Sequence, residues 1–457
     1  MMLEKIKKIN KGWWFLVLVL FSFVFRLSLT NMAMHDDIVV QAGWGHWIYE
    51  NKSMYGFYEN NKWIYGWPNQ PPLISYLYGC GFRIHEGLNT AMVGLGNFIA
   101  LNRLGASHIP WYYKFAVWFS ADKFENTPYD HGQLISLKLI PIFADLVLAG
   151  LFYWIVKKYN NGKKALIISA LYLLSPFSWY ESALWGQHDQ MSLIFVLLAF
   201  LALTNKWIIL APLLWAISIW IKSTGLIFAP LLVWGAIRNK VSFTKFLVGS
   251  ILTLGVYYLT VTAISPNNFI TFNLNLIKQM FAKGDYATWV NTFNFWRLVT
   301  PFQTDSRNLF LGISYSIWGY LIFGAINIYA FWQGRKRDFW SMMRALFIIS
   351  FGGWLFMSTM HERYLFTAIG SGLLLTTQYP KISKYWMVLS LVFWLNMYWA
   401  WWKPTEWDWI KNIVAGQNEG LVAKLLSVLM IGTFAVLVKR LRVKTEVART
   451  NGNKANN

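Results

Sequence analysis

Apolar runs long enough to cross a bilayer recur along almost the whole chain, separated by short polar segments. A membrane-spanning helix needs about 20 mainly apolar residues, and the hydrophobic pattern predicts about 12 of them. The predicted spans are residues 13–30, 137–156, 164–180, 190–204, 207–221, 223–237, 244–264, 310–332, 345–360, 364–379, 385–402 and 419–438. We therefore predict an all-α polytopic membrane protein, with residues 1–457 forming a single membrane domain.

The charges of the loops alternate along the chain. One set of loops is basic, with the segments KIKKINK, KKYNNGKK and QGRKRD, whereas the intervening loops carry most of the acidic residues. Because cytoplasmic loops are enriched in Lys and Arg, we expect both termini to be cytoplasmic, including the basic tail 439–457, and the acidic loops to be extracytoplasmic. IWIKSTG interrupts the apolar run 207–237, and two short spans joined at Lys222 keep this alternation, whereas a single kinked span inverts it.

Composition agrees with a membrane protein and narrows its partners. The 457 residues are 56% hydrophobic and 13% charged, against about 25% charged in soluble proteins. The net charge of +21 lies mainly in short loops, where it sets topology and meets anionic lipid heads of the bilayer, so we expect no nucleic-acid partner. The single cysteine, Cys80, excludes an internal disulfide and a cysteine metal cluster. His35 and His188 have no spacing typical of a metal pair, so we predict no metal site.

The first extracytoplasmic loop, residues 31–133, is too long for a simple connection, and such loops are usually functional. It contains a proline turn at Pro71–Pro72 that leads into an apolar segment, and the aromatic stretch WYYKFAVWFSADKF. We predict that both form short helices lying in the membrane interface rather than crossing it.

Chemically capable side chains gather at the outer ends of the predicted spans. The topology places them on one side of the membrane at similar depth, so we expect one shared cleft. The residues are Asp36, Asp37, Gln187, His188, Asp189, Lys222, Arg297, His361, Glu362 and Arg363. A carboxylate beside a hydroxyl can act as a general base, and Arg and His can hold a phosphate. With an apolar groove for a lipid tail, these groups suit sugar transfer from a lipid-linked sugar phosphate.

Five short motifs in order resemble those of the GT-C superfamily, the integral-membrane glycosyltransferases that use polyprenyl-phosphate sugars. These include the dolichyl-phosphate-glucose-dependent glucosyltransferases and the GPI mannosyltransferases. The motifs are HDDIVVQ, NQPPLISYLY, LWGQHDQMS, NFWR and MHERYLF, within residues 13–380.

The resemblance implies roles for individual residues. Asp37 resembles the catalytic base, with Asp36 as the competing candidate, and His361 and Arg363 are expected at the donor phosphate. Lys222 matches a lysine of the family, although Ser223 replaces the following glutamine. The implied reaction is an inverting transfer of a hexose, mannose or glucose, that needs no metal or other cofactor. The implied donor is a polyprenyl-phosphate sugar, and the acceptor is a glycan, a glycolipid or a protein.

Simpler interpretations exist for these residues. The acids Asp36 and Asp37 can be a solvated helix end, Asp189 a helix N-cap, Lys222 a lysine reaching to the headgroups and Arg297 an interfacial anchor. Glu362 and Arg363 can pair with each other. The alternative function is a transporter or flippase of lipid-linked saccharides, which is expected to carry ionisable residues near the middle of the membrane.

Overall fold

Helices form most of the structure. The computed structural model describes residues 11–64, 66–101, 109–124, 127–238, 240–282 and 286–442. The predicted basic tail lies mostly outside the described residues, as does most of the basic N-terminal segment. The α-helices are α2 (Lys11–Leu29), α3 (Asp36–Asn51), α4 (Pro72–Leu101), α5 (Ile109–Ser120), α6 (His131–Tyr159), α7 (Gly162–Leu174), α8 (Pro176–Trp179), α9 (Asp189–Thr204), α10 (Ala211–Ile221), α11 (Ala229–Arg238), α12 (Lys240–Ile264), α13 (Phe269–Ala282), α14 (Trp296–Val299), α15 (Tyr315–Gln333), α16 (Phe339–Phe356), α17 (Phe366–Thr376), α18 (Ser383–Trp401), α19 (Asp408–Val414) and α20 (Glu419–Leu441).

Short 3-10 and π turns and four two-residue strands complete the described elements. The turns are η1 (Tyr180–Trp185, a π-helix), η2 (Ile208–Leu210), η3 (Ser223–Phe228), η4 (Glu362–Leu365), η5 (Pro380–Ile382), η6 (Thr405–Trp407) and η7 (Gly416–Asn418). The strands are β1 (Trp289–Val290), β2 (Leu309–Phe310), β3 (Ile313–Ser314) and β4 (Met360–His361). β1 pairs with β4 in parallel, and β2 pairs with β3 antiparallel.

Five helices of the described chain are long and apolar enough to cross a membrane. They are Gly12–Leu29, His131–Tyr159, Phe243–Ile264, Phe339–Phe356 and Gly416–Leu441. The other predicted spans also coincide with helices, but these do not reach the same length and hydropathy, so the number of 12 spans stays a prediction. The mainly helical character is confirmed.

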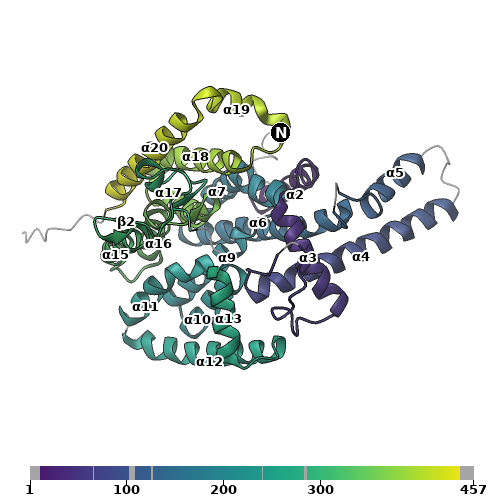
Figure 1. Cartoon of the computed structure of the whole chain (residues 1–457). Coiled ribbons are helices and arrows are strands. Elements are labelled where there is room, and N and C mark those ends of the chain that lie inside the picture. Colours follow the sequence, from purple (N-terminus) through teal and green to yellow (C-terminus); the bar gives the residue numbers. More distant parts are fainter. Residues whose placement is uncertain are drawn as a thin grey trace, which may run out of the picture.

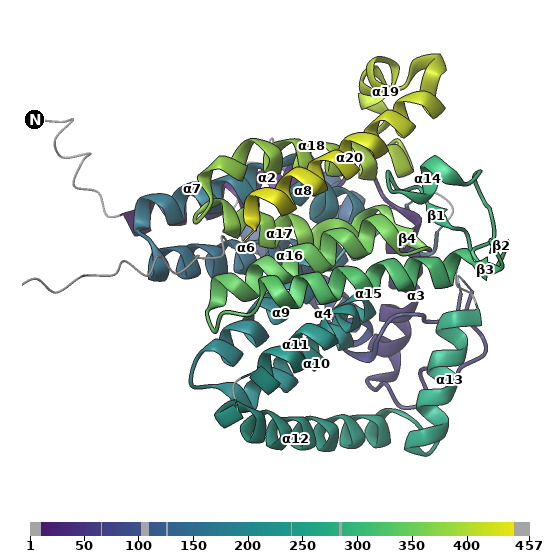
Figure 2. The same cartoon turned by 90° about the vertical axis from the view of Figure 1, so that its left-hand side faces the viewer.

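The long helices differ in how much of their surface the protein itself covers. The apolar window of α16 is 89% buried, whereas those of α2 and α12 are each 17% buried. Figures 1 and 2 show α9 and α16 in the interior, with α12 along one edge and α20 along the opposite edge. The outer helices leave large aliphatic side chains uncovered, as expected of helices that face lipid.

The first outer loop departs from its prediction. After Pro72 the helix α4 continues for 30 residues, so the expectation of a short apolar helix is wrong. The sequence from Leu73 to Leu101 contains no further proline to end it. α5 covers most of the predicted aromatic stretch, and Figure 1 shows α4 and α5 extending together from the body of the protein.

The helix break predicted at Lys222 is present. α10 ends there, and Lys222 has an extended backbone (φ −150°, ψ 123°) before the chain turns into η3 and α11. An extended residue at this point removes the helical hydrogen bonds of the following turn. Lys222 is therefore held at a break inside the protein rather than on a continuous helix.

Two buried contacts of α6 fix the turn that precedes α3. Arg26 of α2 donates to Asp145 of α6 at 3.0 Å, with both side chains fully buried. Lys138 of α6 donates to the carbonyls of Thr30 and Ala33, at 2.7 and 2.6 Å. Both carbonyls belong to the turn between α2, which ends at Leu29, and α3. The two contacts attach the end of α2, and hence the start of α3, to the central helix α6.

Candidate functional site

Asp37 is the centre of a polar cluster at the start of α3. Its Oδ2 accepts hydrogen bonds from Gln187 Nε2 at 2.6 Å and from Trp185 Nε1 at 3.3 Å. Arg363 Nη2 lies 4.0 Å from the same oxygen. The Asp37 side chain keeps 35% of its surface exposed. Three distant parts of the sequence therefore meet at one carboxylate that is still accessible.

The first turn of α3 distinguishes the two neighbouring acids. His35 is the N-cap of α3, and its Nδ1 accepts a hydrogen bond from the Asp37 backbone N–H at 3.0 Å. Successive helical residues point about 100° apart, so only one of the two acids can face the cluster. Asp36 is exposed, and within the described chain no ion pair involves it. The geometry therefore favours Asp37 over Asp36 as the reactive carboxylate.

The motif around Arg363 supplies the cation of the cluster. Arg363 donates to Glu362 at 2.8 Å, so the predicted internal pair exists alongside the approach to Asp37. The guanidinium lies 5.7 Å from the ring centre of Trp185 and 5.8 Å from that of Tyr364. Its Nε has no hydrogen-bond partner in the described structure. Two aromatic rings thus hold a guanidinium that retains a donor.

His361 lies next to Arg363 at the edge of the cluster. It belongs to β4, and the Trp354 indole donates to its backbone carbonyl at 3.0 Å. Its ring packs against Tyr364, and its side chain is 26% exposed. The imidazole and the guanidinium therefore come from one short segment, and both lie close to Glu362.

The segment after η1 brings Gln187 to Asp37 through a special glycine. Gly186 has a left-handed backbone (φ 81°), and a Cβ there would lie 2.3 Å from Ile38 Cδ1. Such a φ favours glycine, and the close approach leaves no space for a side chain. Gly186 therefore allows Gln187 to reach the first turn of α3.

Lys222 and Asp189 form a buried ion pair behind the cluster. Each side chain is 6% exposed. Lys222 therefore does not extend to the headgroups, and Asp189 is the first residue of α9 rather than its N-cap, which is His188. The Lys222 ammonium also lies 5.2 Å from the ring centre of Tyr364, the neighbour of Arg363. This pair thus supports the aromatic wall beside the Arg363 guanidinium.

His188 is buried and neutral. Its Nδ1 shares a hydrogen bond of 3.1 Å with the Tyr78 hydroxyl. Burial, followed by the nearby Lys222 charge, lowers the pKa of His188 to about 3. His188 is therefore uncharged at neutral pH and does not add a cation to the cluster.

The electrostatic environment keeps Asp37 ionised. Burial raises the pKa of Asp37, but the Arg363 charge, aided by the Trp185 hydrogen bond, lowers it below the ordinary value of 3.8. Burial lowers the pKa of the Arg363 guanidinium, but Glu362 and Asp37 raise it above its ordinary value. At neutral pH the cluster therefore holds a carboxylate and a guanidinium, both charged.

Aromatic side chains form one wall of the cluster. The His35 ring stacks on Trp185 at 4.6 Å between ring centres and lies 4.8 Å from Trp401. The two tryptophans are 5.8 Å apart. This wall carries the Trp185 indole that donates to Asp37.

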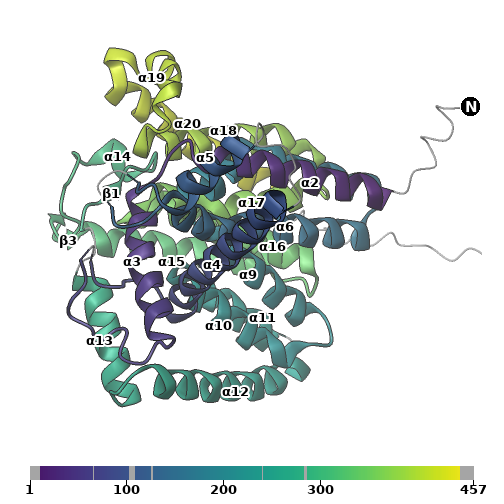
Figure 3. The same ribbon diagram turned by 90° about the vertical axis from the view of Figure 1, so that its right-hand side faces the viewer.

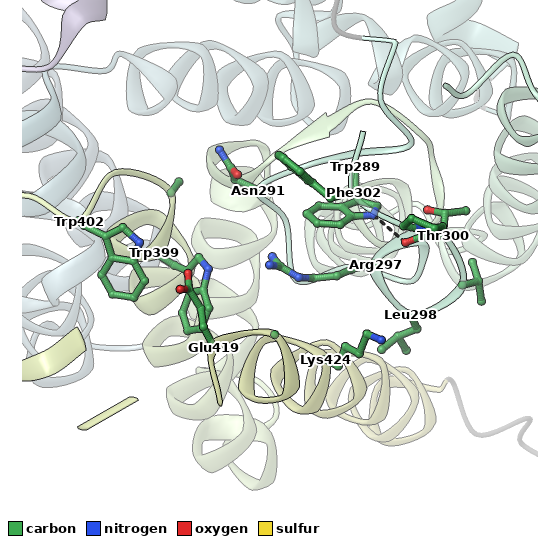
Figure 4. A pocket seen from close by; sticks show the side chains of 14 residues that line it. Trp289, Asn291, Arg297, Leu298, Thr300, Phe302, Trp399, Trp402, Glu419 and Lys424 are labelled. Carbon is green, nitrogen blue, oxygen red and sulfur yellow. Dashed lines mark hydrogen bonds between the residues drawn. The ribbon is translucent and has the colours of Figure 1, made fainter. Parts of the chain in front are cut away.

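Arg297 lies outside this cluster. It belongs to α14 and lines a pocket of about 860 Å³ whose lining includes neither Asp37 nor Arg363. Figure 4 shows its guanidinium between the Trp289 ring and the helix that carries Glu419 and Lys424. The structure thus brings together Asp37, Gln187, His361, Glu362 and Arg363, with the buried residues His188, Asp189 and Lys222 next to them. It leaves Asp36 exposed and separates Arg297 from the cluster.

Several residues of the site were not singled out from the sequence. Trp185 and Tyr364 lie inside motifs that drew attention for their polar residues, and Tyr78 lies inside the motif of Pro71–Pro72. Glu181 is buried beside Asp189, and burial followed by the Asp189 charge raises its pKa well above its ordinary value. Only the position of these residues within the motifs could have identified them from the sequence. An aromatic residue by itself does not indicate a functional site in a membrane protein that is rich in aromatic residues.

The cluster can combine an ionised base with a site for an anion. Asp37 can take a proton from a hydroxyl, and Arg363 with His361 can hold a phosphate. In the part of the chain that the structure describes, no group of three or more His, Cys, Asp and Glu side chains could hold a metal ion. Metal independence itself stays a prediction.

Comparison with known proteins adds little to this geometry. No known family matches the chain, and no curated protein matches it. Among solved structures, the apo form of the oligosaccharyltransferase from Archaeoglobus fulgidus is similar, with 12% identity and a TM-score of 0.37. The match covers 94% of this chain and 56% of that one, so the chain spans little more than half of its length. A TM-score of this size does not establish a shared fold, so function is argued from the site.

Proposed function

We propose that the chain is a GT-C-type membrane glycosyltransferase. It transfers a hexose, mannose or glucose, from a polyprenyl-phosphate sugar to an acceptor hydroxyl on the extracytoplasmic face. The observation that carries the proposal is the meeting of Asp37, Gln187 and Arg363, each from a different motif, around one accessible carboxylate.

The reaction is a single displacement at the anomeric carbon. Asp37 takes the proton from the acceptor hydroxyl. At the same time the oxygen of that hydroxyl forms the new bond to the anomeric carbon. The bond to the phosphate oxygen breaks, and its electron pair leaves with the polyprenyl phosphate. Because attack and departure occur on opposite faces, the configuration inverts, and no covalent intermediate with the protein forms.

Each neighbour of Asp37 has a role in this step. Gln187 and Trp185 hold its Oδ2, which leaves the other carboxylate oxygen to meet the acceptor. Arg363 and His361 bind the phosphate that departs, since a preorganised cation stabilises the developing charge. Lys222, already paired with Asp189, is a positioning residue that supports Tyr364 and through it Arg363.

The transporter alternative depends on ionisable residues inside the predicted spans. Arg26, Lys138 and Asp145 are such residues, and all three are buried. However, Arg26 and Lys138 both donate to acceptors within the protein, and Asp145 accepts from Arg26 and Tyr172. Side chains committed to the fold in this way are poorly suited to bind a passing headgroup, so we favour the enzyme.

Substitution of the base tests the proposal. Because a general base contributes about 10²–10⁴-fold, we expect Asp37→Asn to lower transfer from a polyprenyl-phosphate hexose by roughly 10³-fold while the protein still folds. The matched control is Asp36→Asn, one residue away and exposed. Excess chelator should leave the wild-type rate unchanged. Full activity in Asp37→Asn would exclude this mechanism.

A further inference from the structure

A pocket lies beside the Asp37 cluster. It has a volume of about 860 Å³ and is bounded by the β1–α14 segment, the end of α18 and the start of α20 (Figure 4). Figures 2 and 3 both show β1 and α14 on the same side of the molecule as α3. Nothing in the glycosyl-transfer step described above uses this pocket.

Arg297 is the main charged group of the pocket. Its guanidinium lies 4.4 Å from the ring centre of Trp289 and 5.9 Å from that of Trp399. Stacking uses the faces of the guanidinium and leaves its N–H donors in the plane. Its Nη1 has no partner within the described structure, although it is buried. An anion is the partner that such a guanidinium lacks.

The charge of the pocket is positive. Lys424 adds a second cation, and Glu419 is the acid of the lining. Burial lowers the pKa of Arg297 to about 10, although the Glu419 charge raises it. Arg297 therefore stays charged at neutral pH. Two cations against one carboxylate favour a ligand that carries a negative group.

The remaining lining suits a sugar and a lipid. Trp399, Trp402 and Phe302 offer aromatic faces, and Asn291 adds an amide. Val299, which also lines the pocket, is 52% exposed. Beyond the pocket, α20 presents a row of exposed aliphatic side chains, which are Leu421, Leu425, Val428 and Leu429. The pocket therefore adjoins a surface that fits hydrocarbon.

The pocket is close to the base along two routes. Trp402 lines it, and the preceding Trp401 packs on His35, whose Nδ1 lies 3.5 Å from Asp37 Oδ2. On the other side Trp289 lines it, and β1 continues into the pairing of Val290 with His361. A ligand held here thus lies next to both halves of the cluster.

We propose that this pocket binds the acceptor as an anionic, lipid-linked saccharide, with Arg297 and Lys424 on its phosphate and Trp399 and Trp402 against its sugar. The proposal rests on the glycosyl-transfer function and specifies its acceptor class. The acceptor enters from the lipid side of α20, and its hydroxyl reaches Asp37 past the Trp401 wall.

Binding to the full chain in phosphatidylcholine nanodiscs tests this assignment by calorimetry. The two probes are farnesyl-diphosphate N-acetylglucosamine and farnesyl N-acetylglucosaminide, which share a sugar and a tail but differ in charge. Because a hydrogen bond to a charged group is worth about 1.5–3 kcal/mol, or tenfold to a hundredfold, Arg297→Gln should weaken binding of the charged probe by about tenfold or more. It should leave the neutral probe within about twofold.

Two controls separate this pocket from the donor site and from general charge. Arg307→Gln removes an exposed arginine of the same loop that does not line the pocket, and should not change either affinity. Arg363→Gln should leave the charged probe bound. If Arg363→Gln abolishes that binding and Arg297→Gln does not, the pocket assignment is wrong. Lys424→Gln, on the exposed rim, should also weaken the charged probe, and an unchanged affinity in a folded Lys424→Gln protein overturns the proposal as well.

Turnover distinguishes this proposal from the reaction itself. With a polyprenyl-phosphate hexose as donor, Arg297→Gln should raise the KM for the charged acceptor about tenfold and leave the donor KM within about twofold. A selective rise in donor KM would assign the pocket to the donor instead. If the wild type transfers no sugar from any donor, glycosyl transfer fails, while the binding experiment still decides what the pocket holds.

Discussion

Two carboxylate–guanidinium pairs in this protein have opposite characters. Arg26 and Asp145 lie 3.0 Å apart between α2 and α6, with no exposed surface. Asp37 and Arg363 are 4.0 Å apart, and their side chains remain 35% and 15% exposed. A carboxylate and a guanidinium are thus in direct contact in the Arg26–Asp145 pair and held slightly apart in the Asp37–Arg363 pair.

The difference lies in how completely each pair is satisfied. Arg26 donates to Asp145, to Ser22, to Ser178 and to the carbonyl of Leu173. Arg363 has only Glu362 as a close acceptor, and its Nε has none in the described chain. A saturated pair can contribute only to the fold, whereas an unsaturated pair can receive a ligand. The following predictions test this contrast, from the largest expected effect to the smallest.

The largest effect is expected on stability. Asp145→Asn leaves the Arg26 guanidinium buried without its counter-charge, and removing one partner of a buried pair costs about 3–5 kcal/mol. Thermal unfolding of the detergent-solubilised protein should show this loss, while the turnover of the folded fraction stays close to wild type. A large fall in turnover with unchanged stability would give this pair a functional role.

The second effect is expected on catalysis. Arg363→Gln should lower kcat/KM about 100-fold, because it removes charged hydrogen bonds to the phosphate worth roughly 1.5–3 kcal/mol. Stability should also fall, but less than in Asp145→Asn, because Glu362, whose side chain is 3% exposed, loses the one cation that it pairs with at close range in the described structure. Arg363→Lys should recover part of the rate because it keeps the charge without the bidentate fork. Equal losses in both variants would show that geometry rather than charge is decisive.

The third effect is a shift in pH dependence. The base must be ionised, and Arg363 holds the pKa of Asp37 below 3.8 against the effect of burial. Without Arg363, burial dominates and the pKa rises, so the acid limb of kcat/KM should move to higher pH by about one unit. Profiles of wild type and Arg363→Gln between pH 3 and 7 measure the shift. An unchanged acid limb would mean that the two groups are not coupled.

The smallest effect is expected at Asp36. This side chain is exposed and forms no ion pair within the described chain, so Asp36→Asn should change the rate by less than about twofold. The comparison with Asp37→Asn, measured on the same preparations, assigns the base. A tenfold or greater loss in Asp36→Asn would exchange the two roles.

Much of the fold was predictable because a bilayer imposes strong patterns. The apolar runs located nearly every long helix, and IWIKSTG located the break at Lys222. The length of α4 was not predictable from two prolines, since they mark where a helix begins and not where it ends. The Arg26–Asp145 pair joins residues 119 positions apart, and nothing local to either residue names its partner.

The site was predictable to a similar degree. Motif order brought Asp37, Gln187 and Arg363 to one place, because each lies at the outer end of a predicted helix. The choice between Asp36 and Asp37 depended on the geometry of the His35 N-cap. The spacing of residues along the sequence does not show this geometry. Arg297 also lies at the predicted outer side, but depth and side are too coarse to distinguish the Asp37 cluster from the neighbouring pocket.

Gly186 is a position at which homologous chains can be compared. A Cβ there would meet the Ile38 side chain, one residue after the proposed base, at a backbone φ of 81° that favours glycine. We therefore expect homologous chains that use the same carboxylate and keep a large residue at position 38 to retain glycine at this position. Its replacement during divergence would identify the branches in which the original chemistry has been lost.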